Sequence, residues 1–412
     1  MSTNDITIIG AGIIGLCSGL ALQEEGYQVT LLDKAEPGQG ASYGNAGIIS
    51  PWSIVPQSLP GLWKKIPGWL LDPMGPVTVR PSYLPQMAYW GTRFLMNGRT
   101  NKVRQTASIM HTLVRDCIPS YQQLLAGTGA ENLLQDAYYV QAYRHAKDAN
   151  LNALDYHIRA EYGAELDYID AQELHQLEPA LSKDFKAAIL IKGQARLTSP
   201  GRLGLVLANK FTQAGGLIKQ SHVNAIQPTQ GGWQYEAHGK LHKTSNLLLC
   251  AGAWSSDLLK TINIKVLMQN ERGYHILFPN LDMQLNNSVM DADMKFVASQ
   301  MEDGLRIAGT AEFDDKDAPL NEKRAKGLAQ LSQRMFPDIS QQQIQPWVGV
   351  RPSMPDSLPC IGSVKQHPGL YVAFGHSHYG MMMAPKTGQL ISQHIAGKIS
   401  SDSMHDFRLN RF

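Results

Sequence analysis

The chain has 412 residues, of which 43% are hydrophobic and 17% charged, with a formal net charge of +2. This length allows two domains of ordinary size, because single hydrophobic cores stop growing at about 250–300 residues. The nearly neutral charge gives no sign of the clustered basic face that nucleic-acid-binding proteins usually have, so this class of function is not expected.

The N-terminal apolar run, residues 6–22, is neither a signal peptide nor a membrane span by its pattern. No basic residue precedes it, four glycines interrupt it, and it is shorter than the roughly 20 residues that a span needs. The cysteines (Cys17, Cys117, Cys250, Cys360) are scattered without a CxxC pair. We therefore expect a cytoplasmic protein with buried, reduced thiols.

The first thirty residues predict one strand–helix–strand unit. Residues 6–9 form a short β-branched run that ends at glycine, residues 13–25 have helical apolar spacing, and residues 28–32 indicate a second strand. This is the order and size of a βαβ crossover.

Later elements predict that this α/β layer is interrupted and then resumed, with a mixed sheet in a separate layer. In chain order they are a proline- and tryptophan-rich stretch over 51–85, helical spacing over 86–125, an extended stretch over 137–143, a helix over 201–214, a strand over 217–226, a central strand over 247–250, alternating strands over 262–344, a strand over 370–374 and a helix over 385–396. The fold class expected is α/β.

The turn after the first strand carries the pattern GxGxxG at Gly10, Gly12 and Gly15. Such a triple is weak evidence alone, but here it lies between a strand and a helix, and Asp33 ends the next strand. Gly10 permits the tight turn, Gly12 lets backbone approach a pyrophosphate, and Gly15 lets the helix pack closely. The carboxylate of Asp33 suits ribose hydroxyls and disfavours NADP.

The segment after the second strand indicates which cofactor, FAD or NAD, the glycine motif binds. Residues 36–47 form a loop of small residues, whereas a simple NAD-binding unit continues into another crossover helix. The N–H groups of this loop and Ser42 are suited to the second half of a longer cofactor. The sequence therefore favours FAD.

These motifs resemble the D-amino-acid oxidase superfamily of FAD-dependent oxidoreductases, and most closely D-amino-acid dehydrogenase small-subunit-like proteins. The resemblance runs in order along nearly the whole chain. It rests on the glycine fingerprint with Asp33, residues 42–51, Arg272-Gly273-Tyr274, residues 347–362, and residues 375–380 ahead of Met383-Ala384.

The resemblance implies a discontinuous FAD-binding domain, from residues 1–50, 196–261 and 345–412. It also implies a mixed-sheet substrate domain from residues 51–195 and 262–344. The cofactor-binding residues that follow are Gly10, Gly12, Ile13, Ile14, Gly15, Asp33, Lys34, Ala41, Ser42, Asn45, Ala46, Gly47, Ile48, Val223, Ala251, Gly252, Trp254, Gly375, His376, Ser377, His378, Tyr379, Gly380 and Met381. Cys360 and the C-terminal histidines lie in the region of flavin attachment, yet we expect non-covalent FAD.

The implied reaction is hydride transfer from the α-carbon of a D-amino acid to flavin N5, which gives an imine or a keto acid. The branch often has other residues where Arg272, Ser377, His378 and Tyr379 stand, close to the expected flavin and substrate. A D-proline or hydroxy-D-proline substrate therefore competes with D-alanine-like ones. The alternatives are a glycine/sarcosine-type oxidase using O₂, and a flavin-bearing subunit without turnover.

Four side chains are the candidates for the chemistry. A guanidinium fork binds a carboxylate through two parallel hydrogen bonds, and Arg351 is the first choice for this role. Tyr274 is expected to add a phenol to the same carboxylate, and His376 and His378 lie in the turn expected to face the flavin. No third ligand is spaced near these histidines, so no metal site is predicted.

Residues 51–71 combine Trp52, Trp63 and Trp69 with Lys64 and Lys65. This mixture fits either a peripheral contact with the inner face of a membrane or, as we favour, an active-site lid packed on the substrate domain. With membrane contact the electron acceptor would be a quinone of the respiratory chain; otherwise O₂ competes for that role.

Overall fold

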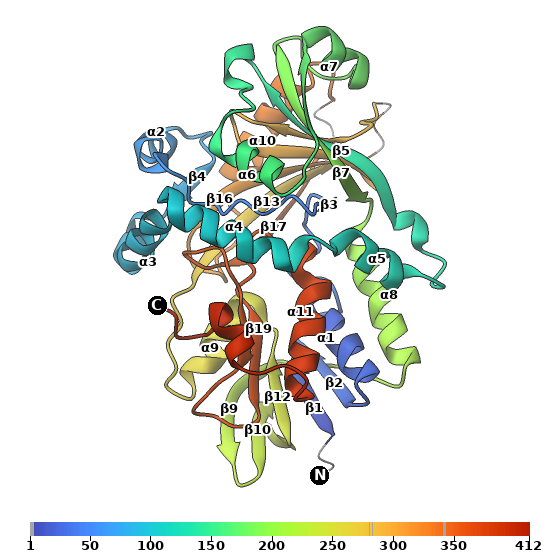
Figure 1. The fold of residues 1–412 in the computed structure, drawn as a ribbon, viewed down its shortest axis with the longest axis vertical. Helices are drawn as coiled ribbons and strands as arrows, with labels where there is room; N and C mark the ends of the chain where they lie inside the picture. Colours follow the sequence, from blue (N-terminus) through green and yellow to red (C-terminus); the bar gives the residue numbers. More distant parts are fainter. Residues whose placement is uncertain (1–3, 280, 282, 341–342) are drawn as a thin grey trace.

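The computed structural model describes residues 4–279, 281, 283–340 and 343–412. Two sheets dominate this part of the chain, one in each half of the molecule (Figure 1). Strands pair mostly parallel in the lower half, whereas long strands pair mostly antiparallel in the upper half. The large cavity described below lies where the two halves meet.

The lower sheet is six-stranded and mainly parallel. Its central strands are buried, as expected for a sheet covered on both faces, whereas the edge strand β8 is mostly exposed. In spatial order they are β18 (Cys360–Ser363), β19 (Leu370–Phe374), β12 (Asn246–Leu249), β1 (Asp5–Ile9), β2 (Gln28–Asp33) and β8 (Leu217–Gln220), and β18 alone among them runs antiparallel to its neighbour. A three-stranded sheet lies beside them: β11 (Lys240–Thr244), β10 (Gly232–Ala237) and β9 (Val223–Thr229).

The upper sheet is ten-stranded and mixed. It follows the order β17 (Gln345–Ser353), β13 (Gln269–Phe278), β16 (Gly304–Phe313), β15 (Phe296–Met301), β14 (Ser288–Asp291), β5 (Leu134–Tyr143), β7 (Ala187–Leu197) and β3 (Ile48–Ile49), with β4 (Val77–Val79) on β16 and β6 (Leu166–Asp170) on β7. Strand β17 belongs to this sheet, although the sequence assigned residues 345–412 to the FAD-binding segments.

The helices divide into those that cover the lower sheet and those that do not. Those on the lower sheet are α1 (Ile13–Glu24), α8 (Pro200–Gln213), α9 (Ser255–Lys260) and α11 (Gly380–Ile395). The others are α2 (Ile66–Leu71), α3 (Leu84–Asn97), α4 (Thr100–Val114), α5 (Cys117–Leu125), α6 (Leu154–Glu161), α7 (Ala171–Leu177) and α10 (Glu322–Met335). Helices α1 and α11 run side by side (Figure 1), and a Cβ on Gly388 would lie 2.6 Å from the carbonyl oxygen of Cys17, so their backbones nearly touch.

Four predicted elements differ from the structure. The stretch 262–344, expected as alternating strands, contains the helix α10. The helical region 86–125 is divided among α3, α4 and α5, and the strand expected over 217–226 is two strands, β8 and β9, in different sheets. The last helix begins at Gly380 instead of 385 and contains Pro385. A proline lacks the N–H that would bond to the carbonyl four residues earlier, at Met381. The hydroxyl of Tyr121 on α5 donates to that carbonyl at 2.6 Å and replaces the missing donor.

Candidate functional site

A cavity of about 1530 Å³ lies between the two sheets. It extends from the glycine turn after β1, past the loop that follows β2, to the mixed sheet and the turn before α11. This volume exceeds the roughly 300–1,000 Å³ of sites for drug-sized ligands, so the cavity has room for a long cofactor together with a substrate.

The glycine turn presents open backbone to the cavity. Gly10 has φ +111°, which favours glycine, and Gly12 has no atom near the position of a Cβ. No side chain caps the N-terminus of α1 at Gly12, so the first N–H groups of the helix are available to phosphate oxygens. Gly15 lies behind the turn, where a Cβ would be 1.8 Å from the carbonyl oxygen of Gly10.

The carboxylate of Asp33 is fixed at the end of β2. Its Oδ2 accepts the N–H of Ala11 at 2.7 Å and its Oδ1 accepts the N–H of Ala35 at 3.0 Å. Next to it, the Lys34 ammonium lies 3.4 Å from the ring centre of Trp254. Burial lowers the pKa of Lys34. Asp33, Lys34 and Trp254 line the same end of the cavity wall as Val223, Ala251 and Gly252.

The small-residue loop is held from the mixed sheet. Arg306, on β16, donates through Nη1 to the carbonyl oxygens of Tyr43 and Asn45, at 2.9 and 3.0 Å. The members of the loop that line the cavity are Gln39, Gly40, Ala41, Ser42, Gly44, Asn45 and Ala46, and Ile48 lines it directly after the loop. Gly47 does not line it; a Cβ there would lie 2.3 Å from the carbonyl oxygen of Leu197, so this glycine serves the close packing of the loop.

The turn before α11 forms another part of the wall, and residues 375–381 all line the cavity. Ser377 has φ +49° and its Oγ accepts the N–H of Met354 at 3.1 Å. His376 is buried, with Nε2 3.0 Å from Thr387 Oγ1, and burial lowers its pKa to about 3. His376 is therefore neutral at physiological pH, and its ring ties the turn to α11.

These features together fit FAD. The open glycine turn suits a pyrophosphate, the fixed carboxylate suits a ribose, and the cavity continues far enough for a tricyclic ring. Of the predicted cofactor residues, Gly15 and Gly47 lie behind the wall and the others line it.

A charged network on the mixed sheet borders the same cavity. Glu271, on β13, accepts at Oε1 from Arg351 Nη1 at 2.8 Å and from His378 Nε2 at 2.5 Å, and at Oε2 from Ser353 Oγ at 2.5 Å. Burial alone would raise the pKa of Glu271, but the charges and hydrogen bonds of His378, Arg351 and Ser353 lower it to about 2. Glu271 is thus an ionised, buried carboxylate.

Arg351 lines the cavity, and the sequence did not predict its partner, Glu271. Its Nη1 also donates to the carbonyl oxygen of Thr310 at 3.1 Å, while among the described residues no hydrogen bond uses Nη2 or Nε. One edge of the guanidinium is therefore available to a ligand. Sequence reasoning missed Glu271, although a carboxylate inside a strand of otherwise buried residues is a usable signal.

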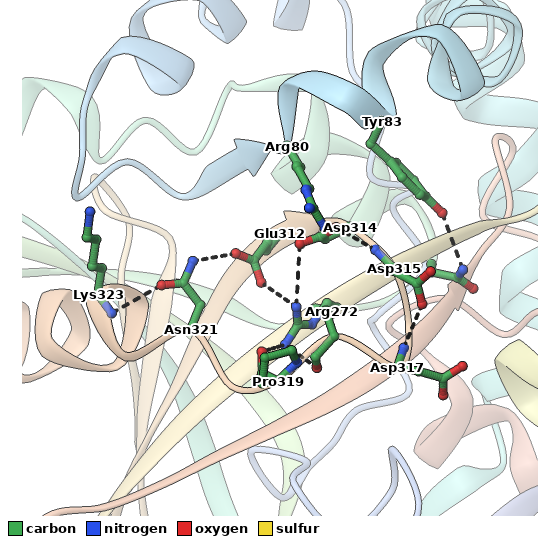
Figure 2. Close-up of polar contacts among 12 residues, drawn as sticks. Arg80, Tyr83, Arg272, Glu312, Asp314, Asp315, Asp317, Pro319, Asn321 and Lys323 are labelled. Atoms are coloured by element: carbon green, nitrogen blue, oxygen red, sulfur yellow. Dashed lines mark hydrogen bonds and ion pairs between the residues drawn. The ribbon is translucent and has the colours of Figure 1, made fainter.

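Tyr274 and Arg272 belong to a second polar cluster. Tyr274 borders the cavity, but its hydroxyl donates to the carboxylate of Glu312. Burial, and then this hydrogen bond, raise the pKa of Tyr274. Figure 2 shows Arg272 between Glu312, Asp314 and the carbonyl of Pro319, with Nη1 3.3 Å from Glu312. Arg272 is fully buried there and does not line the cavity, so its role is to support the sheet.

The segment 51–71 walls the mouth of the cavity through Ser53, Val55, Leu59, Leu62 and Trp69. Trp52 packs inward, with Nε1 donating to the carbonyl oxygen of Lys192 at 2.9 Å. Trp63 and Leu71 remain exposed. Over the described part of the chain, no helix combines the length and apolar character needed to cross a bilayer.

The cysteines are free and buried. Cys360 is fully buried, accepts from Arg411 Nη1 at 3.3 Å, and does not line the cavity. Within residues 4–279, 281, 283–340 and 343–412, no three acidic, histidine or cysteine side chains are grouped to hold a metal ion.

Comparisons with known proteins identify the family of the chain. A family model described as FAD dependent oxidoreductase (DAO) matches residues 5–394. The chain is 33% identical to a D-amino-acid oxidase of Bradyrhizobium diazoefficiens, over 99% of this chain and 98% of that protein. It is 27% identical to a D-amino acid dehydrogenase of Vibrio atlanticus, over 99% and 100% of the two chains.

Among solved structures, glycine oxidase from Geobacillus kaustophilus superposes with a TM-score of 0.75 at 20% identity, over 99% of this chain and 98% of that one. This likeness confirms the predicted α/β fold with its parallel and mixed sheets. Because the family model spans nearly the whole chain, the predicted FAD cofactor is confirmed as well, and the chain belongs to the DAO family of FAD-dependent oxidoreductases.

Proposed function

We propose that the protein oxidises a D-amino acid at the bond between its α-carbon and amine nitrogen, giving an imine or, after hydrolysis, a keto acid. A D-proline or hydroxy-D-proline type of substrate falls within this proposal. Similarity over the full length to proteins named D-amino-acid oxidase and D-amino acid dehydrogenase supports it.

The observation that carries the proposal is the available edge of Arg351. This guanidinium lies on the cavity wall that the turn 375–381 also forms, and Nη1 is held by Glu271 and Thr310. The remaining Nη2 and Nε can donate two parallel hydrogen bonds to a carboxylate. A substrate held in this way has its α-carbon at a fixed distance from the guanidinium group.

Bound FAD supplies the two-electron acceptor for this oxidation. The chain supplies orientation and exclusion of water: Arg351 binds the carboxylate, residues 375–381 and 41–48 form parts of the cavity wall, and the segment 53–62 covers its mouth. Tyr274 contributes shape, because its proton is already donated to Glu312.

An anaerobic screen of flavin bleaching tests the function. It covers both enantiomers of the amino acids and hydroxyprolines, with glycine and sarcosine included. Bleaching by D-enantiomers is expected; bleaching by glycine and sarcosine alone favours the amine-oxidase alternative, and bleaching by no amino acid contradicts the proposal. Acid precipitation of the same sample should leave a yellow supernatant, because we propose that FAD is bound non-covalently and the thiol of Cys360 lies away from the cavity.

We infer that a quinone, reached at a membrane surface, accepts the electrons. Exposed apolar side chains gather on the segment 61–96 near the cavity mouth: Trp63, Leu70, Leu71, Leu84, Tyr89, Leu95 and Met96. Lys64 and Lys65 add positive charge that attracts anionic lipid. Sedimentation with anionic vesicles should be lost in the double variant Trp63→Ser, Leu71→Ser. Rapid peroxide formation in air, at a rate matching that with an artificial dye, would contradict the quinone assignment.

A further inference from the structure

His378 borders the cavity beside Arg351 and takes part in the same network. Its side chain is 34% exposed, whereas that of its partner Glu271 is 3% exposed. The imidazole therefore has one edge against a buried carboxylate, and part of the ring is open to the cavity where the substrate would lie.

The contact with Glu271 selects the form of the ring. An ionised carboxylate only accepts hydrogen bonds, so the 2.5 Å contact requires a hydrogen on Nε2 of His378. In the neutral ring the other nitrogen, Nδ1, then carries the lone pair. Glu271 itself is poorly placed to accept a further proton, because Arg351, His378 and Ser353 already donate hydrogen bonds to its carboxylate.

The charges around His378 come from several elements. Glu271 on β13 contacts His378 directly through Oε1, and Arg351 on β17 contacts the same oxygen atom. Tyr379, the next residue, donates its phenol to the carbonyl oxygen of Val55 at 2.8 Å. Arg159 on α6 and Tyr139 on β5 lie close enough to Tyr379 to interact with it electrostatically. Glu271 is the one carboxylate among these groups, and it can offset a positive charge on the His378 ring.

We propose that His378 is the proton acceptor for the substrate ammonium and that Glu271 is the residue that positions it. An α-amino group is largely protonated at neutral pH and then has no lone pair with which to form the C=N bond. In the proposed step the N–H bond breaks, the proton passes to Nδ1 of His378, and the nitrogen keeps the electron pair. This pair forms the C=N bond as hydrogen leaves the α-carbon with its two electrons to the oxidised flavin. The resulting imidazolium is stabilised by the Glu271 carboxylate.

The inference rests on the proposed function, and its test has a readout other than turnover. 2-Methylalanine carries an ammonium and a carboxylate but no α-hydrogen, so the holoenzyme can bind it and cannot oxidise it. Isobutyrate has the same shape without the amine. The quantity measured is the ratio of their dissociation constants, Kd of 2-methylalanine over Kd of isobutyrate, between pH 5 and pH 9.

In the wild type this ratio should rise about tenfold for each unit by which the pH is lowered on the acid side. The reason is that a protonated His378 must release its proton before it can accept one from the ligand. His378→Asn should give a ratio that does not change with pH, and should lower kcat/KM by about 10²-fold, as loss of a general base typically does. Glu271→Gln should move the acid limb of both the ratio and kcat/KM to lower pH.

The chain offers a matched control. Glu161 bridges Arg104 and His157 on the surface, at 2.5 and 3.1 Å, and does not line the cavity. Glu161→Gln and His157→Asn should leave the ratio and the pH profile unchanged. If D-amino acids bleach the flavin but the wild-type ratio does not change with pH, the proton-acceptor role of His378 is wrong and the proposed function still holds. If no amino acid bleaches the flavin, both fail together.

Discussion

The guanidinium of Arg351 lies flat against the α-carbon of Gly273, so close that a Cβ there would be 2.2 Å from Nη2 and 2.3 Å from Cζ. Gly273→Ala should therefore displace Arg351 and raise the KM for the amino acid about tenfold or more, with FAD still bound. Gly327→Ala is the control, because Gly327 lies in α10 with open space around its α-carbon. Steady-state kinetics and the flavin absorbance of both variants check this; an unchanged KM in Gly273→Ala would contradict the contact.

Removal of the guanidinium itself should have a larger effect. Arg351→Ala should raise KM about 30- to 100-fold, because hydrogen bonds between charged groups are worth about 1.5–3 kcal/mol. Arg351→Lys should recover part of the loss, since a single ammonium keeps the charge without the planar fork. Unchanged kinetics in Arg351→Ala would remove this residue from the site.

Asp33 should govern FAD affinity without affecting the substrate. Asp33→Ala removes the acceptor of two backbone N–H groups and the expected partner of the ribose. FAD should bind about 10- to 100-fold more weakly, because a hydrogen bond to a charged group is worth about 1.5–3 kcal/mol. Reconstitution of apoprotein with increasing FAD measures this directly, and wild-type affinity in the variant would show that Asp33 does not contact the cofactor.

The C-terminus is fastened by Arg411. Its Nε and Nη2 donate to Asp356 at 2.7 and 3.0 Å, and both side chains are largely buried, with 11% exposed. Arg411→Ala should lower the free energy of unfolding by about 3–5 kcal/mol, because it leaves the buried Asp356 carboxylate without its charged partner. Urea unfolding checks this; a loss below 1 kcal/mol would mean that water replaces the guanidinium.

The pH dependence of stability should carry the signature of Glu271. Its pKa in the folded protein is about 2, below its ordinary value of 4.5, so its contribution is present above pH 4.5 and is lost as the pH falls towards 2. The stability difference between wild type and Glu271→Gln should therefore shrink from pH 5 to pH 3. A difference that stays constant in urea unfolding over this range would contradict an ionised Glu271.

The sequence predicts those parts of the site that depend on local rules. The glycine turn, Asp33, the small-residue loop and the turn before α11 are each fixed by a few consecutive residues, and their backbone or side chains line one cavity. Asp33 was recognisable because its place relative to the glycines follows from the length of one helix and one strand.

The rest depends on pairing between distant segments. Glu271 meets Arg351 because β13 and β17 pair antiparallel in a register that sets these two residues opposite each other, and His378 arrives from a third segment. No local pattern fixes that register. The same reason explains the strand expected over 217–226, whose two halves pair with different partners, Thr30 to Asp33 on one side and β10 on the other.

The Tyr121 hydroxyl bonded to the carbonyl of Met381 makes α5 a part of the turn that borders the flavin site. A helix interrupted by proline near its start cannot fix its own first turn, so its geometry depends on a residue some 260 positions earlier in the chain. A designed protein that kept the two sheets and their glycine loops, but had its outer helices redesigned for solubility, would lose the contact that holds this part of the cavity wall.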